Sequence, residues 1–364
     1  MSSDIHIEPR RDEVVVRFRR EGALEDVSRH SLLVGRLTAR AFKKLGRLDP
    51  DLELAHQYTV IQLSTTTGRV EVLLSTHPTV HGERMVLRLQ TPQSVDKLDL
   101  HAELLELLSR PYGLVLLSAP EGNGLSATAY ASLGHIVEHS QGRSSIFSLE
   151  DPVRSFLDGV IQVQVESGRP ELNHACHVRD ATRQDADLLH CDAVPDEECA
   201  SELLRAASTG HLVLAQVIAA DVAGALKSFA DLIHDATSLR QLGRILQGVM
   251  SQRLAPRLCP DCREPAELPA RARATVEAEL GRIPDFWRPR GCSSCKGSGS
   301  RGWTAIQQVL ASDEQVGELL VERLPLVLFR QQLQRLGHPA MRRCALEAAA
   351  AGRISLDEAL SISS

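Results

Sequence analysis

Short alternating runs of apolar and polar residues mark the first ninety positions of the chain. Residues 4–20 read DIHIEPRRDEVVVRFRR, which predicts two strands around a turn at Pro9–Asp12. A helix is expected over Ser31–Leu45, and further strands end in the alternating segment Arg84–Leu89. The pattern indicates a small mixed α/β domain over residues 1–95, with a linker at Thr91–Asp96 where Pro92 stands among polar residues.

From Tyr112 onward the pattern changes to continuous apolar strands separated by helical spacers. GLVLLSAP, SSIFSLEDP, DLLHCDA and HLVLAQVI are four such runs. Strands of this kind, alternating with helices, predict a parallel sheet covered on both faces. We expect this core over residues 96–255, a small module rich in Pro, Gly and Cys over 256–302, and a helical region over 303–364 that includes LPLVLFRQQLQRL.

Composition narrows the class of protein. The chain has 364 residues and is 43% apolar, which is enough to form hydrophobic cores. Its formal charge of −6 means that it lacks the excess of positive charge that attracts nucleic acid. No apolar run approaches the ~20 residues that span a bilayer, and the polar start MSSDIHIEPRRDEVVV is not a signal peptide. We therefore expect a cytoplasmic protein that touches a membrane only peripherally, through partners.

Four of the eight cysteines form two Cys-x-x-Cys pairs, Cys259/Cys262 and Cys292/Cys295, separated by the 29 residues 263–291. Two such knuckles can complete a closed tetrahedral zinc site, which is structural because it leaves no open position for catalysis. The spacer is longer than usual, but a predicted helix at Pro269–Leu280 brings its ends together. The other cysteines fit small core residues or inert thiols.

The turn APEGNGLS, residues 119–126, has the layout of a phosphate-binding loop between a strand and a helix. In the working pattern G-x-x-x-x-G-K-[ST], backbone N–H groups cradle phosphates, Lys reaches the β and γ phosphates, and Ser/Thr holds Mg²⁺. Gly124 and Ser126 match and Gly122 adds a flexible position, but Ala119 replaces the first Gly and Leu125 replaces the Lys. No lysine occurs between Lys97 and Lys227 to substitute. Taken alone, the loop is better explained as a plain strand-turn-helix.

Several longer segments, in order and with fitting gaps, resemble the type II secretion and type IV pilus assembly ATPases (general secretory pathway protein E-like). They are SDIHIEP (3–9), VRFRREG (16–22), PTVHGER (78–84), LEDPV (149–153), RQDAD (183–187), TGHLVL (209–214), QRL (252–254), both cysteine pairs and GRISLDE (352–358). The resemblance implies a PAS-like domain, a RecA-like P-loop NTPase core, a Cys₄ zinc module and a helical tail. It also implies a ring of six subunits.

The departures from the family pattern fall at catalytic positions. Beside Leu125, Ala193 stands where the family has the second-motif Glu, and Ile218 where the histidine box has its second His. The segment AHQYT (55–59) has no counterpart of an arginine that the family carries there. An arginine aimed at a γ-phosphate can be worth ~10³–10⁵ in rate.

Three polar residues are candidate remnants of the nucleotide site, and for each a purely structural role is the alternative. Asp192 ends an apolar strand and either holds Mg²⁺ or caps the next turn. Glu150, in the acidic box whose Glu assists catalysis in the family, equally suits a strand-ending turn. His211 is either an active-site remnant or a satisfied core histidine.

The combined interpretation is a pseudo-ATPase that binds ATP and Mg²⁺ weakly and acts as a subunit or regulator of a type II secretion or type IV pilus machine. The expected partners are active homologous subunits or further copies in a hexameric ring, where Arg17, Arg19, Glu83 and Arg84 are either ring contacts or local ion pairs. Two alternatives stay open, a slow ATP-binding traffic ATPase and a folded product without function. The family has a further N-terminal region that docks on the membrane platform, and because this chain starts at the linker-domain signature, we expect contact with the platform to be indirect.

Overall fold

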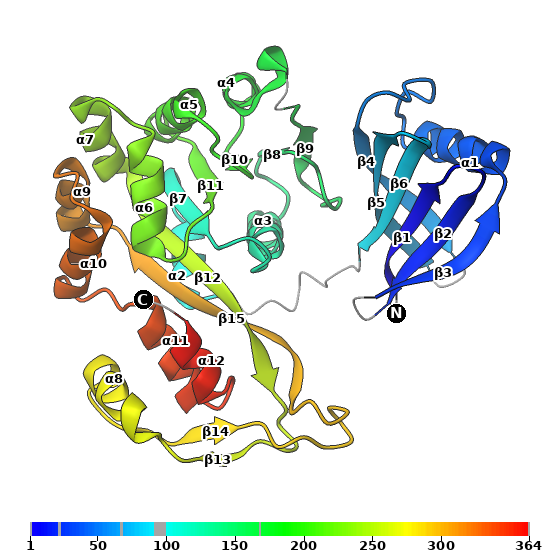
Figure 1. Cartoon of the computed structure of the whole chain (residues 1–364). Helices are drawn as coiled ribbons and strands as arrows, with labels where there is room; N and C mark the ends of the chain where they lie inside the picture. Colours follow the sequence, from blue (N-terminus) through cyan, green and yellow to red (C-terminus); the bar gives the residue numbers. More distant parts are fainter. Residues whose placement is uncertain (1, 21–22, 66–67, 91–99, 167–168, 363–364) are drawn as a thin grey trace. The chain divides into compact units, whose positions relative to one another are not determined.

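The computed structural model describes residues 2–20, 23–65, 68–90, 100–166 and 169–362 (Figure 1). The chain divides into two compact units. The first comprises residues 1–97 with the segments Glu150–Asp158 and Gln162–Val165, and the second comprises the remainder from Leu98. The linker predicted at Thr91–Asp96 lies outside the described residues. Among the described residues, no helix is long and apolar enough to cross a membrane.

The first unit is built on a six-stranded antiparallel sheet in the order β3-β2-β1-β6-β5-β4. Its strands are β1 (Ser2–Pro9), β2 (Val14–Arg20), β3 (Ala23–His30), β4 (Gln57–Thr65), β5 (Gly68–Thr79) and β6 (Gly82–Gln90). One helix, α1 (Leu32–Leu45), begins at Ser31, whose hydroxyl accepts a hydrogen bond from the Val34 backbone N–H. The predicted turn, helix and closing strand of this part are all confirmed.

The core of the first unit follows from strand alternation. Val72 and Leu74 on β5, and Met85 and Leu87 on β6, are buried because residues two apart share one face of a sheet. Ala39 of α1 packs into the same cluster.

Charged residues considered as ring contacts make ion pairs within this unit. Glu83 is buried beside Lys43. Arg84 pairs with Glu8 at 3.3 Å, and Arg17 pairs with Asp26 at 3.0 Å. These contacts supply the local role that the sequence left open for these residues.

The second unit is built on a seven-stranded sheet in the order β15-β12-β7-β11-β10-β8-β9. Strands β7, β11, β10 and β8 are parallel, as predicted, and β12 joins them parallel to β7. Every residue of β7 and β11 is buried, so both faces of the sheet are covered there. The strands are β7 (Gly113–Ser118), β8 (Ile146–Glu150), β9 (Ile161–Gln164), β10 (Leu188–Cys191), β11 (Leu212–Val217), β12 (Leu246–Leu258) and β15 (Ser300–Ala311).

Helices connect and cover these strands. They are α2 (Ala102–Leu108), α3 (Leu125–Ser140), α4 (His174–Thr182), α5 (Glu197–Ser208), α6 (Val222–Asp231) and α7 (Ala236–Ile245), with a 3₁₀ turn at Pro170–Leu172. Asparagine or aspartate side chains cap α4, α5, α6 and α7 by accepting from a backbone N–H of the first turn.

The C-terminal part departs from the prediction of a purely helical region over 303–364. Strand β12 continues to Leu258 and pairs antiparallel with β15, which occupies 300–311, so the first helix after the cysteines is α9, starting at Glu314. The run WTAIQQVL is rich in aromatic and β-branched residues, which favour strands. The neighbouring Pro/Gly-rich segment obscured this signal. The two long strands form a ribbon that carries the cysteine-rich module at its far end (Figure 1).

The module and the helices after it pack together. The module contains β13 (Glu264–Ala266), α8 (Ala270–Leu280) and β14 (Phe286–Arg288), and it is followed by α9 (Glu314–Val321), α10 (Leu326–Arg335), α11 (Met341–Ala350) and α12 (Leu356–Ser361). Val276 of α8, Phe286 of β14 and Ile306 of β15 share a core with residues of α11 and α12. The predicted helices at Pro269–Leu280 and through LPLVLFRQQLQRL are both confirmed.

Candidate nucleotide site and cysteine cluster

The candidate phosphate-binding loop connects β7, which ends at Ser118, to α3, which begins at Leu125. Gly122 and Gly124 both have φ +76°, a left-handed conformation that glycine adopts without a steric penalty. Gly124 is the N-cap of the 16-residue helix α3. The first N–H groups of such a helix have no intrahelical partner and attract anions. The backbone of the loop thus keeps a geometry suited to phosphate.

Strand β12 holds the loop in this conformation. The side-chain amide of Gln252 donates to the backbone carbonyl of Asn123 at 2.8 Å, and the Asn123 side chain accepts from the Leu254 backbone N–H at 2.9 Å. The Gln252 carbonyl oxygen accepts from the Thr128 hydroxyl at 2.8 Å and from the Gln307 amide at 3.0 Å. Gln252 is 1% exposed. The QRL segment was recognised in the sequence, but this role was not, because nothing in the spacing pairs 252 with 123.

The loop, residues 119–126, contains no lysine or arginine that could replace the lysine of the working pattern. Leu125 is the first residue of α3 and is half-buried, and Ser126 follows it. Ala119, at the position of the first loop glycine, is buried. The loop therefore offers phosphate its backbone N–H groups and the Ser126 hydroxyl.

Two of the remnant residues end strands at the same edge of the sheet as the loop. Because β7, β8, β10 and β11 are parallel, their carboxyl ends meet at one edge. Glu150 ends β8, is buried, and accepts a hydrogen bond from the Gln162 amide at 3.0 Å. Asp192 follows β10 and accepts from Nε2 of buried His174 at 2.9 Å. Ala193, next along the chain, brings no carboxylate to this edge.

His211 lies at the opposite edge. It precedes β11, and its backbone carbonyl accepts from Gly113, the first residue of β7, at 3.0 Å. Strand β11 has six residues, so at ~3.3 Å per residue about 20 Å separate the two edges. The His211 Nδ1 contacts the Ala206 carbonyl oxygen at 3.0 Å. The structure therefore does not bring His211 to the loop, and the reading of it as an active-site remnant is corrected. Ile218, 66% exposed, follows β11 at the loop edge.

The four paired cysteines form one cluster, as the sequence predicted. Their sulfur atoms lie within 4.8 Å of one another. Three Sγ–Sγ separations are 3.9 Å (Cys259–Cys292), 3.8 Å (Cys262–Cys295) and 3.7 Å (Cys292–Cys295). Four sulfurs bonded at ~2.3 Å around a tetrahedral Zn²⁺ ion would be about 3.8 Å apart. The spacing therefore fits zinc.

Backbone N–H groups point at the cluster. Cys295 Sγ accepts from the N–H of Cys292 at 3.2 Å and from the N–H of Gly299 at 3.1 Å, and these bonds lower the pKa of the Cys295 thiol to about 6. Burial raises the pKa of the Cys262 thiol to about 12. The fold thus favours the thiolate, which is the metal-binding form, at Cys295, whereas Cys262 must lose a proton when a metal binds.

The segment GRISLDE attaches the cysteine module to the C-terminal helices. The carbonyl oxygen of Gly352 accepts from Arg263 Nη1 at 2.6 Å, and the carbonyl oxygen of Arg353 accepts from the Leu258 N–H at 2.8 Å. The Arg263 guanidinium also stacks over the Trp287 ring, 4.9 Å from its centroid. This segment therefore has a structural role next to the cluster.

Comparisons with known proteins agree with this geometry. The family described as "Type II/IV secretion system protein" matches residues 1–361. The chain is 33% identical over 382 residues to "Type II secretion system protein E" of Aeromonas hydrophila, covering 99% of this chain and 72% of that one. It is 30% identical over 370 residues to "Type II secretion system ATPase E" of Vibrio cholerae, with the same coverage.

Solved structures show the same fold. The pilus retraction motor PilT with bound ADP superposes with a TM-score of 0.69 at 21% identity, covering 100% of this chain and 93% of that one. The Legionella pneumophila ATPase DotB gives a TM-score of 0.67 at 18% identity, covering 99% and 90%. The predicted P-loop ATPase fold is thus confirmed, while the PAS-like character of the first unit stays a prediction. With a family match along nearly its whole length, this chain belongs to the type II/IV secretion system protein family.

Proposed function

We propose that this protein is a non-hydrolysing member of its family, acting as a subunit or regulator of a type II secretion or type IV pilus machine. The observation that carries the proposal is a loop with phosphate-binding geometry whose lysine position is Leu125. A cation at that position binds the phosphates and offsets the charge that develops during phosphoryl transfer. Losing one charge-assisted contact costs ~1.5–3 kcal/mol in binding.

Two further positions at the loop edge support inactivity. Ala193 follows Asp192 where the resemblance implies a glutamate that positions water, and Ile218 stands where it implies a histidine. These losses act on the same transition state. We therefore expect them to compound and to reduce turnover far more than binding.

What remains at the site favours weak nucleotide binding. Gly122, Gly124 and the start of α3 supply backbone N–H groups, and Ser126 and Asp192 are the residues left to hold Mg²⁺. Asp192 already accepts from His174, so Mg²⁺ would have to share or displace that contact. Glu150 is buried and accepts a hydrogen bond from Gln162, so it has a structural role that does not involve nucleotide.

Steady-state ATP hydrolysis and binding of a fluorescent ATP analogue test the proposal together. We expect no turnover above background, and weak binding that Leu125→Lys strengthens. Leu125→Lys with Ala193→Glu should restore more turnover than Leu125→Lys alone. Leu125→Met is the matched control, because it keeps the size of the side chain without adding charge. Clear hydrolysis by the unmodified chain, lost on Ser126→Ala, would instead make it a slow ATPase.

We also propose that Cys259, Cys262, Cys292 and Cys295 hold one structural Zn²⁺ ion. The sulfur spacings and the N–H groups directed at Cys295 support it. Metal analysis of protein purified without added zinc should give one equivalent. Cys262→Ser should lose it, whereas Cys176→Ser, outside the cluster, should keep it. Full zinc content in the Cys262→Ser variant would contradict the assignment.

The proposed setting is the cytoplasm, in a hexameric ring with active homologous subunits, meeting the inner-membrane platform indirectly. Family membership supports this setting, and weak nucleotide binding makes a homomeric ring unstable. Light scattering should show monomers or small oligomers alone and larger assemblies when an active paralogue is added. A stable homohexamer without nucleotide would count against the mixed ring.

A further inference from the structure

Helix α1 of the first unit leaves several large apolar residues exposed on the side that faces away from the sheet. Its 14 residues bury Gly35, Ala39 and Lys43. Such a helix normally turns its large apolar side chains toward the core and its charges toward water. Here the buried positions are two small residues and a lysine, joined by Leu32 and Phe42, which are partly buried against the core.

The other large apolar side chains of α1 point outward. Leu33, Leu37 and Leu45 are 66%, 58% and 54% exposed, and Val34 is 44% exposed. With Ala41, which is also exposed, they recur every four residues and form a continuous ridge. At 100° per residue, the centre of this ridge lies opposite the buried Gly35–Ala39–Lys43 side. A contiguous exposed apolar surface of this kind marks an interaction site.

A basic row runs beside the apolar ridge. Arg36, Arg40 and Lys44 also recur every four residues, and residues 31–47 contain no Asp or Glu. The whole chain carries a charge of −6 and only five lysines, two of which lie in this helix. The ridge therefore has a positive flank on an otherwise acidic protein.

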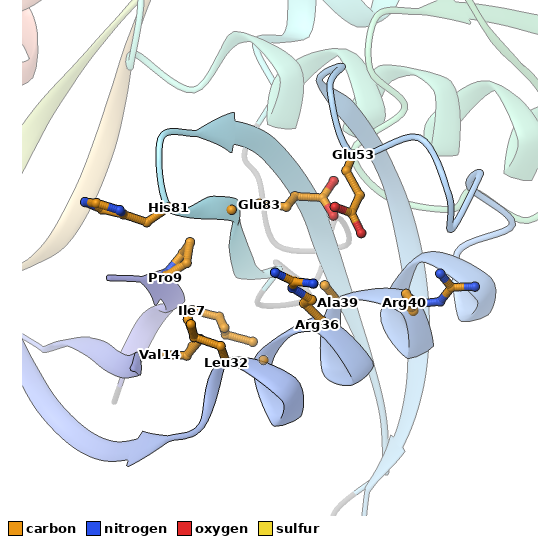
Figure 2. Close-up of a pocket in the computed structure, with 12 residues that line it drawn as sticks. Ile7, Pro9, Val14, Leu32, Arg36, Ala39, Arg40, Glu53, His81 and Glu83 are labelled. Carbon is orange, nitrogen blue, oxygen red and sulfur yellow. The ribbon is translucent and has the colours of Figure 1, made fainter. Parts of the chain in front are cut away.

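A small cavity borders the basic row. It measures about 60 Å³ and lies between α1 and the turn at His81–Glu83 (Figure 2). Arg36 and Arg40 line it from the helix. Arg40 pairs with Asp51 at 2.7 Å, so its guanidinium is held at this border. Ile7, Val14 and Leu32 add apolar lining, which suits a short side chain inserted from outside.

We propose that the outward face of α1 docks an amphipathic helix of a partner protein with acidic residues along one flank. Ridges of residues four apart on two helices interdigitate, which is the commonest way helices pack. Carboxylates on the partner flank would face Arg36, Arg40 and Lys44, while its apolar residues cover Leu33, Leu37 and Leu45. Charge complementarity thus selects the occupant.

The same charges argue against the two other occupants. Two copies of α1 packed antiparallel would bring their basic rows to the same side of the helix pair, and like charges repel. An anionic membrane surface would also meet Asp49 and Glu53, exposed in the loop that follows α1, and Asp51, which already pairs with Arg40. A single narrow helix contacts the ridge and the basic row and avoids these acids.

Binding of designed probes to the full chain tests the proposal. The first probe is a labelled helical peptide with leucines every three to four residues and glutamates on one flank, and the second has lysines in place of the glutamates. The third consists of vesicles containing phosphatidylglycerol. By fluorescence anisotropy and vesicle flotation, we expect binding of the Glu peptide only, weakening as salt is raised.

Surface variants assign the binding to α1. Leu37→Asn and Arg36→Glu should each weaken Glu-peptide binding by about thirtyfold, the lower bound for an interface hot spot. Val27→Asn and Arg11→Glu, at exposed positions elsewhere in the unit, should leave it unchanged, and circular dichroism confirms that all four variants fold. Binding of vesicles or of the Lys peptide alone, equal Glu-peptide binding by all variants, or self-association lost in Leu37→Asn would each overturn the proposal.

Photo-cross-linking in cells identifies the natural occupant. A benzophenone amino acid at position 37, but not at position 27, should cross-link to another protein. The cross-linked peptide should carry apolar residues at helical spacing with Asp or Glu beside them. Cross-links to a basic segment, to lipid or to this chain itself would contradict the proposal.

Discussion

The side-chain amide of Gln252 on β12 donates to the backbone carbonyl of Asn123, 2.8 Å away at the tip of the loop between β7 and α3. The same glutamine accepts from Thr128 on α3 and Gln307 on β15. One buried side chain therefore joins the candidate phosphate-binding loop, its helix and the two-stranded ribbon. These contacts support the shape of the loop.

Replacing Gln252 by Glu should destabilise the second unit by about 1–3 kcal/mol, because a carboxylate oxygen would face the Asn123 carbonyl where an N–H now donates. Urea unfolding measures the change. Gln241→Glu, at an amide that contacts Ser208 near the surface, is the control and should stay within ~0.5 kcal/mol. Equal stability of the two variants would show that the contact with Asn123 contributes little.

The buried pair Lys43–Glu83 predicts a strong effect of removing one partner. Lys43→Met leaves Glu83 buried without its ion pair, and breaking such a pair costs about 3–5 kcal/mol. Thermal unfolding should show the loss, and adding Glu83→Leu should recover much of it, because an apolar pair replaces the ionic one. Lys44→Met, at the exposed neighbouring lysine, should change stability by less than ~0.5 kcal/mol. A double variant as unstable as Lys43→Met would contradict this account.

Zinc affinity should rise with pH. Because burial raises the pKa of Cys262 to about 12, zinc must displace its proton at neutral pH, and lower pH favours that proton. Cys295, with a pKa lowered to about 6 by the backbone N–H of Cys292, adds a further competing proton only as the pH falls through 6. Competition with a chromophoric chelator between pH 5.5 and 8 measures this, and the slope should steepen at the acid end. A pH-independent affinity would rule out coordination by these thiols.

Gly352→Ala should weaken the attachment of the cysteine module. Gly352 has φ +69°, and a Cβ there would lie 2.4 Å from Arg263 Nη1 and 2.9 Å from Trp287 Cδ1. The left-handed conformation alone costs ~1–2 kcal/mol for a residue with a side chain. Gly142→Ala, with φ +70° and open space around it, incurs only that strain. We expect Gly352→Ala to lower the unfolding temperature more than Gly142→Ala, and equal shifts would show that Arg263 and Trp287 move aside freely.

Local pattern was enough to predict most elements. The alternating run 4–20 became β1 and β2, and the apolar runs became β7, β8, β10 and β11, because strand periodicity and full burial are written in consecutive residues. The missed strand β15 lies next to a Pro/Gly/Cys-rich segment, where local signals conflict. The cysteine cluster was predictable because two Cys-x-x-Cys pairs in one chain are typical of a metal site with four sulfur ligands.

Contacts between residues far apart in the chain could not be predicted from the sequence. Gln252 reaches Asn123 because β12 is placed beside β7, and His211 lies at the far edge of the sheet because it directly precedes β11. The outward apolar ridge of α1 also needed the structure, since its periodicity predicts a helix equally well whichever side faces the sheet. Local order comes from neighbouring residues in the chain, so the sequence determined most elements and the paired cysteines, with β15 as an exception. Strand order and the choice of buried face depend on contacts between distant segments, so only the tertiary structure decided which residues surround the loop and which side of α1 remains open.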